Sequence, residues 1–133
     1  MENDALHKLF TNFNIDKNFA IGNDLVYLPN FETSFTPAFI AKVYTQPELA
    51  YCQQFSQPLL RYASTWAAKE AVYKALKQLG TAIAGWQNIE ILRNKIAGQP
   101  TVVLHQYPNK FDISLSISHD GDYVWAVVVV KQL

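Results

Sequence analysis

The clearest pattern of hydrophobic and polar positions lies near the C-terminal end of the chain. Residues 111–118 alternate Phe, Ile, Leu and Ile with Asp and three Ser, which is the two-residue period of a β-strand with one buried face. The tetrad His-Asp-Gly-Asp at 119–122 contains an Asp-Gly turn, the strongest short-range signal of a β-hairpin. Residues 123–131 are mostly apolar and predict the returning strand. The sequence therefore predicts an antiparallel hairpin with His119 at its mouth.

The first strand is predicted at residues 19–28, which are rich in branched and aromatic side chains and end at a Pro-Asn pair. The two-residue period places Asp24 on one face of this strand, together with Gly22, Val26 and Leu28. A carboxylate on an otherwise apolar face is costly to bury unless it is paired. Asp24 therefore needs a partner, or a position at a bulge or a sheet edge.

Two further strands and four helices complete the predicted elements. The strands are expected at 89–92 and 101–105, joined by a turn that contains Gly98 and Pro100. The helices are expected at 3–13, within an N-terminal extension of residues 1–18, at 37–43, at 46–55 and at 58–79. The third helix opens with a capping box, in which Thr45 and Glu48 each hydrogen-bond the other's backbone.

The longest predicted helix carries an acid and a base on one side. Its apolar stripe is dominated by alanine, which lets a sheet approach closely. Glu70 and Lys74 are one turn apart and project from the same side, whereas Lys69, Tyr73 and Lys77 are expected on the more exposed side. Alone, Glu70 and Lys74 could be a surface pair that stabilises the helix by about 0.3 kcal/mol.

Composition describes one folded domain spanning residues 1–133, with few charges. Apolar residues make up 50% and charged residues 17% of the chain, whereas ordinary soluble domains carry about 25% charged residues. This low charge content favours self-association that hides part of the surface. The longest apolar run, 124–130, is far shorter than the roughly 20 residues that cross a bilayer.

The balance of charges and the single cysteine exclude several classes of function. Eleven basic and eleven acidic residues cancel, so no global field attracts nucleic acid or an anionic membrane. Cys52 is the only cysteine, which excludes an intrachain disulfide and a zinc site built from several thiolates. With no signal-peptide pattern at the N-terminus, we expect a cytoplasmic protein.

Asp24 and Glu70 together suggest a site for a hard cation. Magnesium prefers oxygen ligands and completes its shell with water and substrate phosphates, so two carboxylates fit a phosphate-bearing substrate. No Walker A or GxGxxG motif is present. His119 could belong to this site or could be a turn residue bonded to the backbone.

Four motifs then resemble one family, the 4'-phosphopantetheinyl transferases. They are Gly22-Asn23-Asp24, Trp66-Ala-Ala-Lys-Glu-Ala71 followed by Lys74, Gly98-Gln99-Pro100, and Ser116-Ile-Ser-His119, in the family's order. The resemblance covers about Phe19 to Val130 and is strongest to the short holo-[acyl-carrier-protein] synthase type. It implies an α+β fold in which an antiparallel sheet packs against a long central helix.

The resemblance also implies an activity. The 4'-phosphopantetheine arm of coenzyme A would be transferred to a serine of an acyl carrier protein of lipid synthesis, with release of adenosine 3',5'-bisphosphate. Asp24 and Glu70 match the Mg²⁺ ligands, and Lys74 would contact the phosphates. The positions that match the coenzyme A pocket are Gly98, Pro100, Ser118 and His119. A metal-held water or Glu70 could accept the serine proton, and the protein would be a homotrimer with active sites between subunits.

Three positions depart from the family pattern. The short synthases usually carry arginine at the positions of Asn30, where it meets the acidic recognition helix of the carrier, and of Thr65, and lysine at the position of Gln99. These differences remove positive charge while Asp24 and Glu70 are retained. They favour an enzyme with an altered carrier partner. The alternative is a catalytically silent relative that binds coenzyme A or a carrier protein.

Overall fold

The computed structural model describes residues 18–93 and 99–133. The helix expected at 3–13 and Gly98 of the expected turn lie outside these residues. Within them, no helix is both long and apolar enough to cross a membrane.

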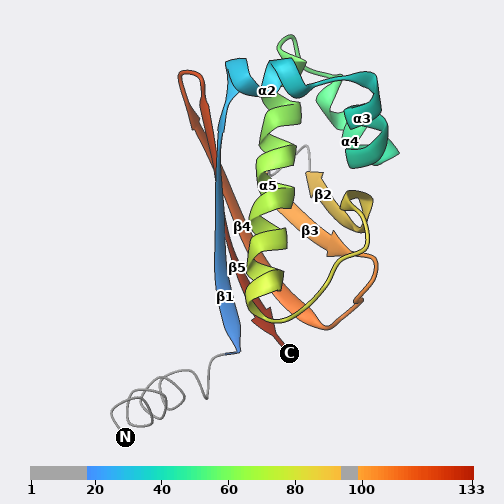
Figure 1. Ribbon diagram of the computed structural model, residues 1–133, viewed down its shortest axis with the longest axis vertical. Helices are drawn as coiled ribbons and strands as arrows, with labels where there is room; N and C mark the ends of the chain where they lie inside the picture. Colours follow the sequence, from blue (N-terminus) through green and yellow to red (C-terminus); the bar gives the residue numbers. More distant parts are fainter. Residues whose placement is uncertain (1–17, 94–98) are drawn as a thin grey trace, which may run out of the picture.

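A three-stranded antiparallel sheet, a two-stranded sheet and one long helix make up most of the fold (Figure 1). The strands are β1 (Phe19–Tyr27), β2 (Ile89–Arg93), β3 (Pro100–Leu104), β4 (Phe111–Asp120) and β5 (Tyr123–Gln132). The helices are α2 (Leu28–Ser34), α3 (Pro37–Val43), α4 (Gln46–Cys52), α5 (Pro58–Gln78) and the short 3-10 helix η1 (Trp86–Asn88). The larger sheet has the order β1-β5-β4, and β2 pairs with β3. The expected α+β fold is confirmed.

The predicted hairpin is formed by β4 and β5, with its turn displaced by one residue. Gly121 and Asp122 are the central residues of the turn, where Asp120 and Gly121 were expected. Gly121 has a φ of 56°, a left-handed conformation that glycine adopts without strain.

The chain after β1 differs from the prediction. Leu28 does not continue the strand but begins α2, in which Pro29 occupies the first turn, where its fixed φ and missing N–H are tolerated. Only Phe31 of this helix is buried. Because α2 lacks a helical apolar period, the hydrophobic pattern could not reveal it. Helix α4 likewise ends at Cys52, short of the expected Phe55.

Helix α5 packs against β1 through very small residues. Ala67, Ala71 and Ala75 are fully buried, and Gly22 of β1 lies directly against their helix. A Cβ atom built on Gly22 would stand 1.9 Å from the carbonyl oxygen of Ala71. Since a methyl group cannot fit there, the glycine sets the spacing between β1 and α5.

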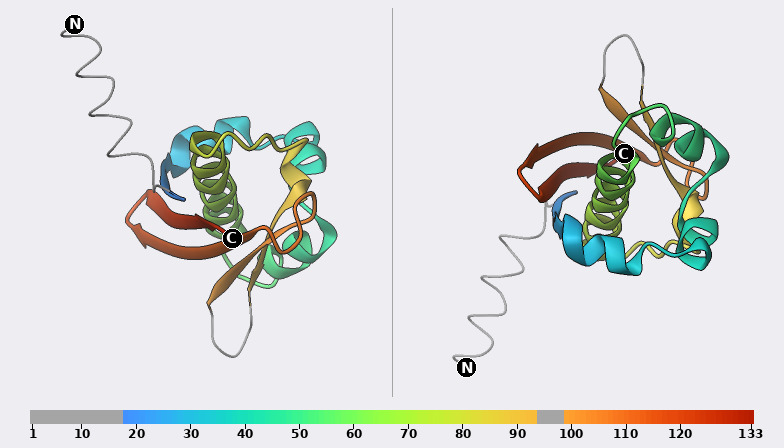
Figure 2. Two further views of the ribbon diagram at one scale, coloured as in Figure 1. Left: turned by 90° about the horizontal axis from the view of Figure 1, so that it is seen from below. Right: turned by 90° about the horizontal axis from the view of Figure 1, so that it is seen from above.

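The opposite face of the larger sheet is apolar and exposed. Figure 2 shows the described helices on one side of this sheet only. On the other side, Leu25 (61% exposed) lies opposite Trp125 (48% exposed). Ile21 (53% exposed) lies opposite Val129 (42% exposed) on the same face. Contiguous exposed apolar patches of this kind mark interaction surfaces.

Candidate active site

Asp24, Glu70 and Lys74 come together between β1 and α5. Asp24 is on the helix-facing side of β1 and is buried. The Lys74 Nζ atom lies 2.9 Å from Asp24 Oδ1 and also donates a hydrogen bond to the Asn23 carbonyl oxygen at 3.1 Å. The partner that a buried Asp24 requires is therefore Lys74.

Asp24 and Glu70 line the same hollow, whose volume is about 310 Å³. Its walls come from the end of β1, from α2 and from the aromatic rings of Phe39 and Trp66. Among the described residues, Asp24 Oδ2 is a buried oxygen with no hydrogen-bond partner. A buried acceptor without a donor is costly unless a ligand satisfies it.

The surroundings of Glu70 favour its protonated form. Burial raises the pKa of Glu70 to about 8, and the neighbouring Asp24 carboxylate acts in the same direction, while Lys74 opposes them. The protonated form of Glu70 is therefore favoured by its burial beside a second carboxylate.

The donor set suits a magnesium ion that keeps most of its water and phosphate ligands. Within residues 18–93 and 99–133, no cluster of three or more His, Cys, Asp or Glu side chains could hold a metal on its own. Two carboxylates with one unsatisfied oxygen fit Mg²⁺, which protein sites often bind through one or two carboxylates. They would not form a closed structural zinc site.

The other predicted site residues lie elsewhere in the chain. Ser118 and His119 line a second hollow with Leu25, Tyr123 and Trp125. By strand alternation and pairing, Ser118 lies opposite the exposed Trp125, on the face away from Asp24. His119 lies opposite the buried Val124 and shares the Asp24 face near the hairpin tip.

Pro100 opens β3 in the smaller sheet, and Gly98 lies outside the described residues. Thus, within one chain, the structure brings Asp24, Glu70 and Lys74 together and leaves Ser118, His119 and Pro100 outside that cluster.

Lys69, expected on the exposed side of the helix, is fully buried, and this prediction is wrong. Its Nζ atom lies 2.7 Å from Glu48 Oε1 and donates hydrogen bonds to the carbonyl oxygens of Val43 and Trp86. The long stem of lysine reaches from the flank of α5 to the short helices, a contact that helical periodicity does not reveal. Burial lowers the pKa of Lys69, and the Glu48 carboxylate opposes this effect.

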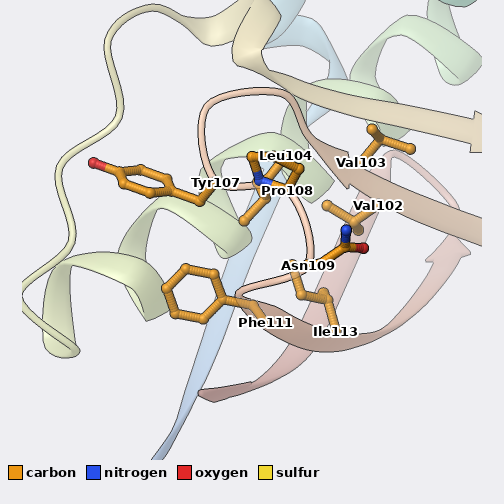
Figure 3. Close-up of a pocket in the computed structure, with 8 residues that line it drawn as sticks. All are labelled: Val102, Val103, Leu104, Tyr107, Pro108, Asn109, Phe111 and Ile113. Carbon is orange, nitrogen blue, oxygen red and sulfur yellow. The ribbon is translucent and has the colours of Figure 1, made fainter. Parts of the chain in front are cut away.

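A further hollow, about 250 Å³ in volume, lies where β3 approaches the start of β4 (Figure 3). It is lined mainly by aliphatic and aromatic side chains, including Val102, Leu104, Phe111 and Ile113. Its lining contains no carboxylate, lysine, arginine or histidine. It therefore lacks the groups that acid–base or metal chemistry requires.

Comparison with known proteins gives the family. The profile of the 4'-phosphopantetheinyl transferase superfamily matches residues 20–128. The chain belongs to this superfamily. The predicted family and the predicted enzyme class, a transferase, are thereby confirmed.

Two curated relatives of this transferase are named holo-[acyl-carrier-protein] synthase. The protein from Moorella thermoacetica is 36% identical, with 83% of this chain and 91% of the relative covered. The protein from Chlorobaculum parvum is 37% identical, with 85% and 98% covered. The solved Chronobacterium ammoniagenes ACPS-CoA complex is 27% identical, with a TM-score of 0.74 over 86% of this transferase and 98% of that chain.

Proposed function

We propose that this transferase moves the 4'-phosphopantetheine arm of coenzyme A to a serine hydroxyl of an acyl carrier protein in a Mg²⁺-dependent reaction. The observation that carries the proposal is the Asp24–Glu70–Lys74 cluster, in which two carboxyl groups line one hollow and an ammonium group binds one of them. The names of the curated relatives and the coenzyme A complex of the structural neighbour support it.

In the proposed reaction the serine oxygen forms a bond to the phosphorus that carries the pantetheine arm. The pyrophosphate P–O bond breaks, adenosine 3',5'-bisphosphate leaves, and the serine proton passes to a base. Asp24 and Glu70 would hold Mg²⁺, which supplies positive charge against the pyrophosphate when bound.

Lys74 has two roles in this scheme. Its ammonium group fixes the Asp24 carboxylate through the 2.9 Å contact, and its side chain is about half exposed, so it can also face a phosphate. Either Glu70 or a water molecule held by the metal would accept the serine proton.

We further propose that the active enzyme is a homotrimer with sites between subunits. Two observations support shared sites. Ser118, which matches the coenzyme A pocket, lies on the opposite face of the larger sheet from Asp24, and that exposed sheet face offers an apolar contact surface. Residues of the expected coenzyme A pocket, Gly98, Pro100, Ser118 and His119, would then come from a neighbouring subunit.

The deciding experiment is direct. The protein is incubated with coenzyme A, Mg²⁺ and candidate apo carrier proteins, including one encoded nearby, and the carriers are weighed by mass spectrometry. We expect one carrier to gain the arm, Glu70→Ala to abolish the gain, and Lys77→Ala, an exposed lysine on the same helix, to preserve it. Normal transfer by Glu70→Ala would refute the site assignment.

A catalytically silent relative is the second candidate, supported by the uncharged residues Asn30, Thr65 and Gln99. Such a protein would bind coenzyme A in a calorimetric titration and would modify no carrier in the same assay.

A further inference from the structure

The strand that carries Asp24 has one free edge. β1 lies at the edge of the larger sheet, beside β5. The Asn18 carbonyl oxygen accepts a hydrogen bond from the Gln132 N–H of β5 at 2.7 Å, so the backbone groups of even-numbered residues point toward β5. Successive residues of a strand direct these groups to opposite edges. The carbonyl groups of Ile21 and Asn23 therefore point to the free edge.

Two side chains of α5 occupy this free edge. The Gln78 Nε2 atom donates a hydrogen bond to the Ile21 carbonyl oxygen at 2.8 Å, and the Lys74 Nζ atom donates one to the Asn23 carbonyl oxygen at 3.1 Å. Lys74 and Gln78 are one helical turn apart and project from the same side of α5. Figure 1 shows β1 running alongside this helix. The strand is therefore held to the helix at two neighbouring points.

The two side chains differ in what else they bind. Lys74 also contacts Asp24 Oδ1 at 2.9 Å, so its ammonium group is shared between the strand edge and the site. Among the described residues, Gln78 is not part of the lining of the hollow that contains Asp24 and Glu70. Its amide is neutral, and therefore has no charge that would draw it to a phosphate.

This difference matters under the proposed function, on which the inference rests. With coenzyme A bound, Lys74 faces the phosphates, and its hold on the strand edge weakens. The amide of Gln78 remains on the Ile21 carbonyl oxygen. We propose that Gln78 is a positioning residue of the transferase, which holds β1 on α5 so that Asp24 keeps its place beside Glu70 while Lys74 serves the phosphates.

Replacement of the amide tests the proposal. Gln78→Met removes the donor and keeps the length of the side chain. We expect kcat to fall about fivefold and the Mg²⁺ concentration for half-maximal rate to rise about fivefold, the size of effect expected for one hydrogen bond. The KM for coenzyme A at saturating Mg²⁺ should be unchanged, because Lys74 stays in place on α5. Calorimetric titration of Mg²⁺ with coenzyme A present and no carrier should show the same weakening.

Two further variants separate positioning from a general loss of stability. Gln54 is also exposed, and its amide donates a hydrogen bond to the Ala50 carbonyl oxygen at 3.2 Å. Gln54→Met is therefore the matched control, and it should leave kcat and the Mg²⁺ requirement unchanged. Gln78→Lys supplies a new donor at the same position, as Lys74 does one turn earlier, and should recover most of both.

Several outcomes would overturn the inference. An unchanged Mg²⁺ requirement in Gln78→Met, an equal change in Gln54→Met, or no recovery in Gln78→Lys would each show that Gln78 does not position the site. A changed assembly size of Gln78→Met in light scattering would mean that it acts through contacts between subunits. No transfer by the natural protein to any carrier contradicts the proposed function itself.

Discussion

Glu70 is the residue whose surroundings most directly bear on chemistry. It is half buried on α5, lies beside a second carboxyl group, and has a pKa raised to about 8, chiefly by burial. The hollow beside it is lined by aromatic rings, which provide little solvation for a second negative charge. Under the proposed function, a cation bound beside Glu70 would compete with the proton that these surroundings favour.

The raised pKa of Glu70 predicts how stability depends on pH without metal. The folded pKa of Glu70, about 8, lies above its ordinary value of 4.5, so its stabilising contribution is full below pH 4.5 and is lost as pH rises through 8. In thermal melts of metal-free protein from pH 5 to 8, the Tm of the natural protein should fall relative to that of Glu70→Gln.

Addition of Mg²⁺ at pH 8 should restore the lost Tm in the natural protein and have little effect on Glu70→Gln. Parallel pH dependences for the two proteins would contradict this description of Glu70.

For single residues, the sequence predicted which side chains form the site better than it predicted which side chains are buried. The family motifs located Asp24, Glu70 and Lys74, and the structure places all three around one point. The exposure of Lys69 could not be predicted, because its partners Glu48, Val43 and Trp86 belong to other segments of the chain. Helical periodicity describes one element at a time, whereas burial depends on what packs against it.

Among the elements, the contact between α5 and β1 determines the geometry of the site. Asp24 and Glu70 come from different elements, so their separation depends on how closely the strand approaches the helix. Gly22 permits this approach because its backbone lies against the carbonyl oxygen of Ala71. The alanine stripe of the sequence predicted close packing, but not that Gly22 would be the point of closest contact.

Gly22→Ala should therefore separate the two elements. The added methyl group would overlap backbone atoms of α5, and overpacking of this kind costs about 1–3 kcal/mol. Urea unfolding should show this loss of stability, together with weaker Mg²⁺ binding. Asn23→Ala, on the other face of β1, is the matched control and should change stability far less. Unchanged stability in Gly22→Ala would contradict the described contact.

The other elements were predicted to different degrees. The β4–β5 hairpin and the Thr45–Glu48 capping box form as expected, because each is specified by local sequence. Helix α2 was missed, since a seven-residue helix with one buried side chain has no apolar period to detect.

For the whole molecule, the exposed sheet face and the divided site residues lead to the same expectation. In the proposed trimer, each site combines Glu70 of one subunit with His119 of its neighbour. A His119→Ala chain still supplies Glu70 and a Glu70→Ala chain still supplies His119, so the two variants together can form an intact site. Mixed trimers made by joint expression should regain roughly a quarter of the natural activity by random assortment, although each variant alone is inactive.

The matched control for this mixing experiment is Glu70→Ala with Lys74→Ala. Both side chains come from α5 of the same subunit, so no arrangement of the mixed chains restores a complete site and no activity should return. Absence of recovery in the Glu70→Ala and His119→Ala mixture would argue for sites contained within one chain.

The Glu48 carboxylate has a consequence for how the molecule unfolds. Its two oxygens accept hydrogen bonds from the Thr45 and Ile91 N–H groups and form the ion pair with Lys69, which joins α4, β2 and α5. Releasing any one of these elements would leave a buried charge or donor without its partner, at a cost of several kcal/mol. The three elements should therefore open together as one cooperative unit, so the helix that carries Glu70 cannot fray independently of them.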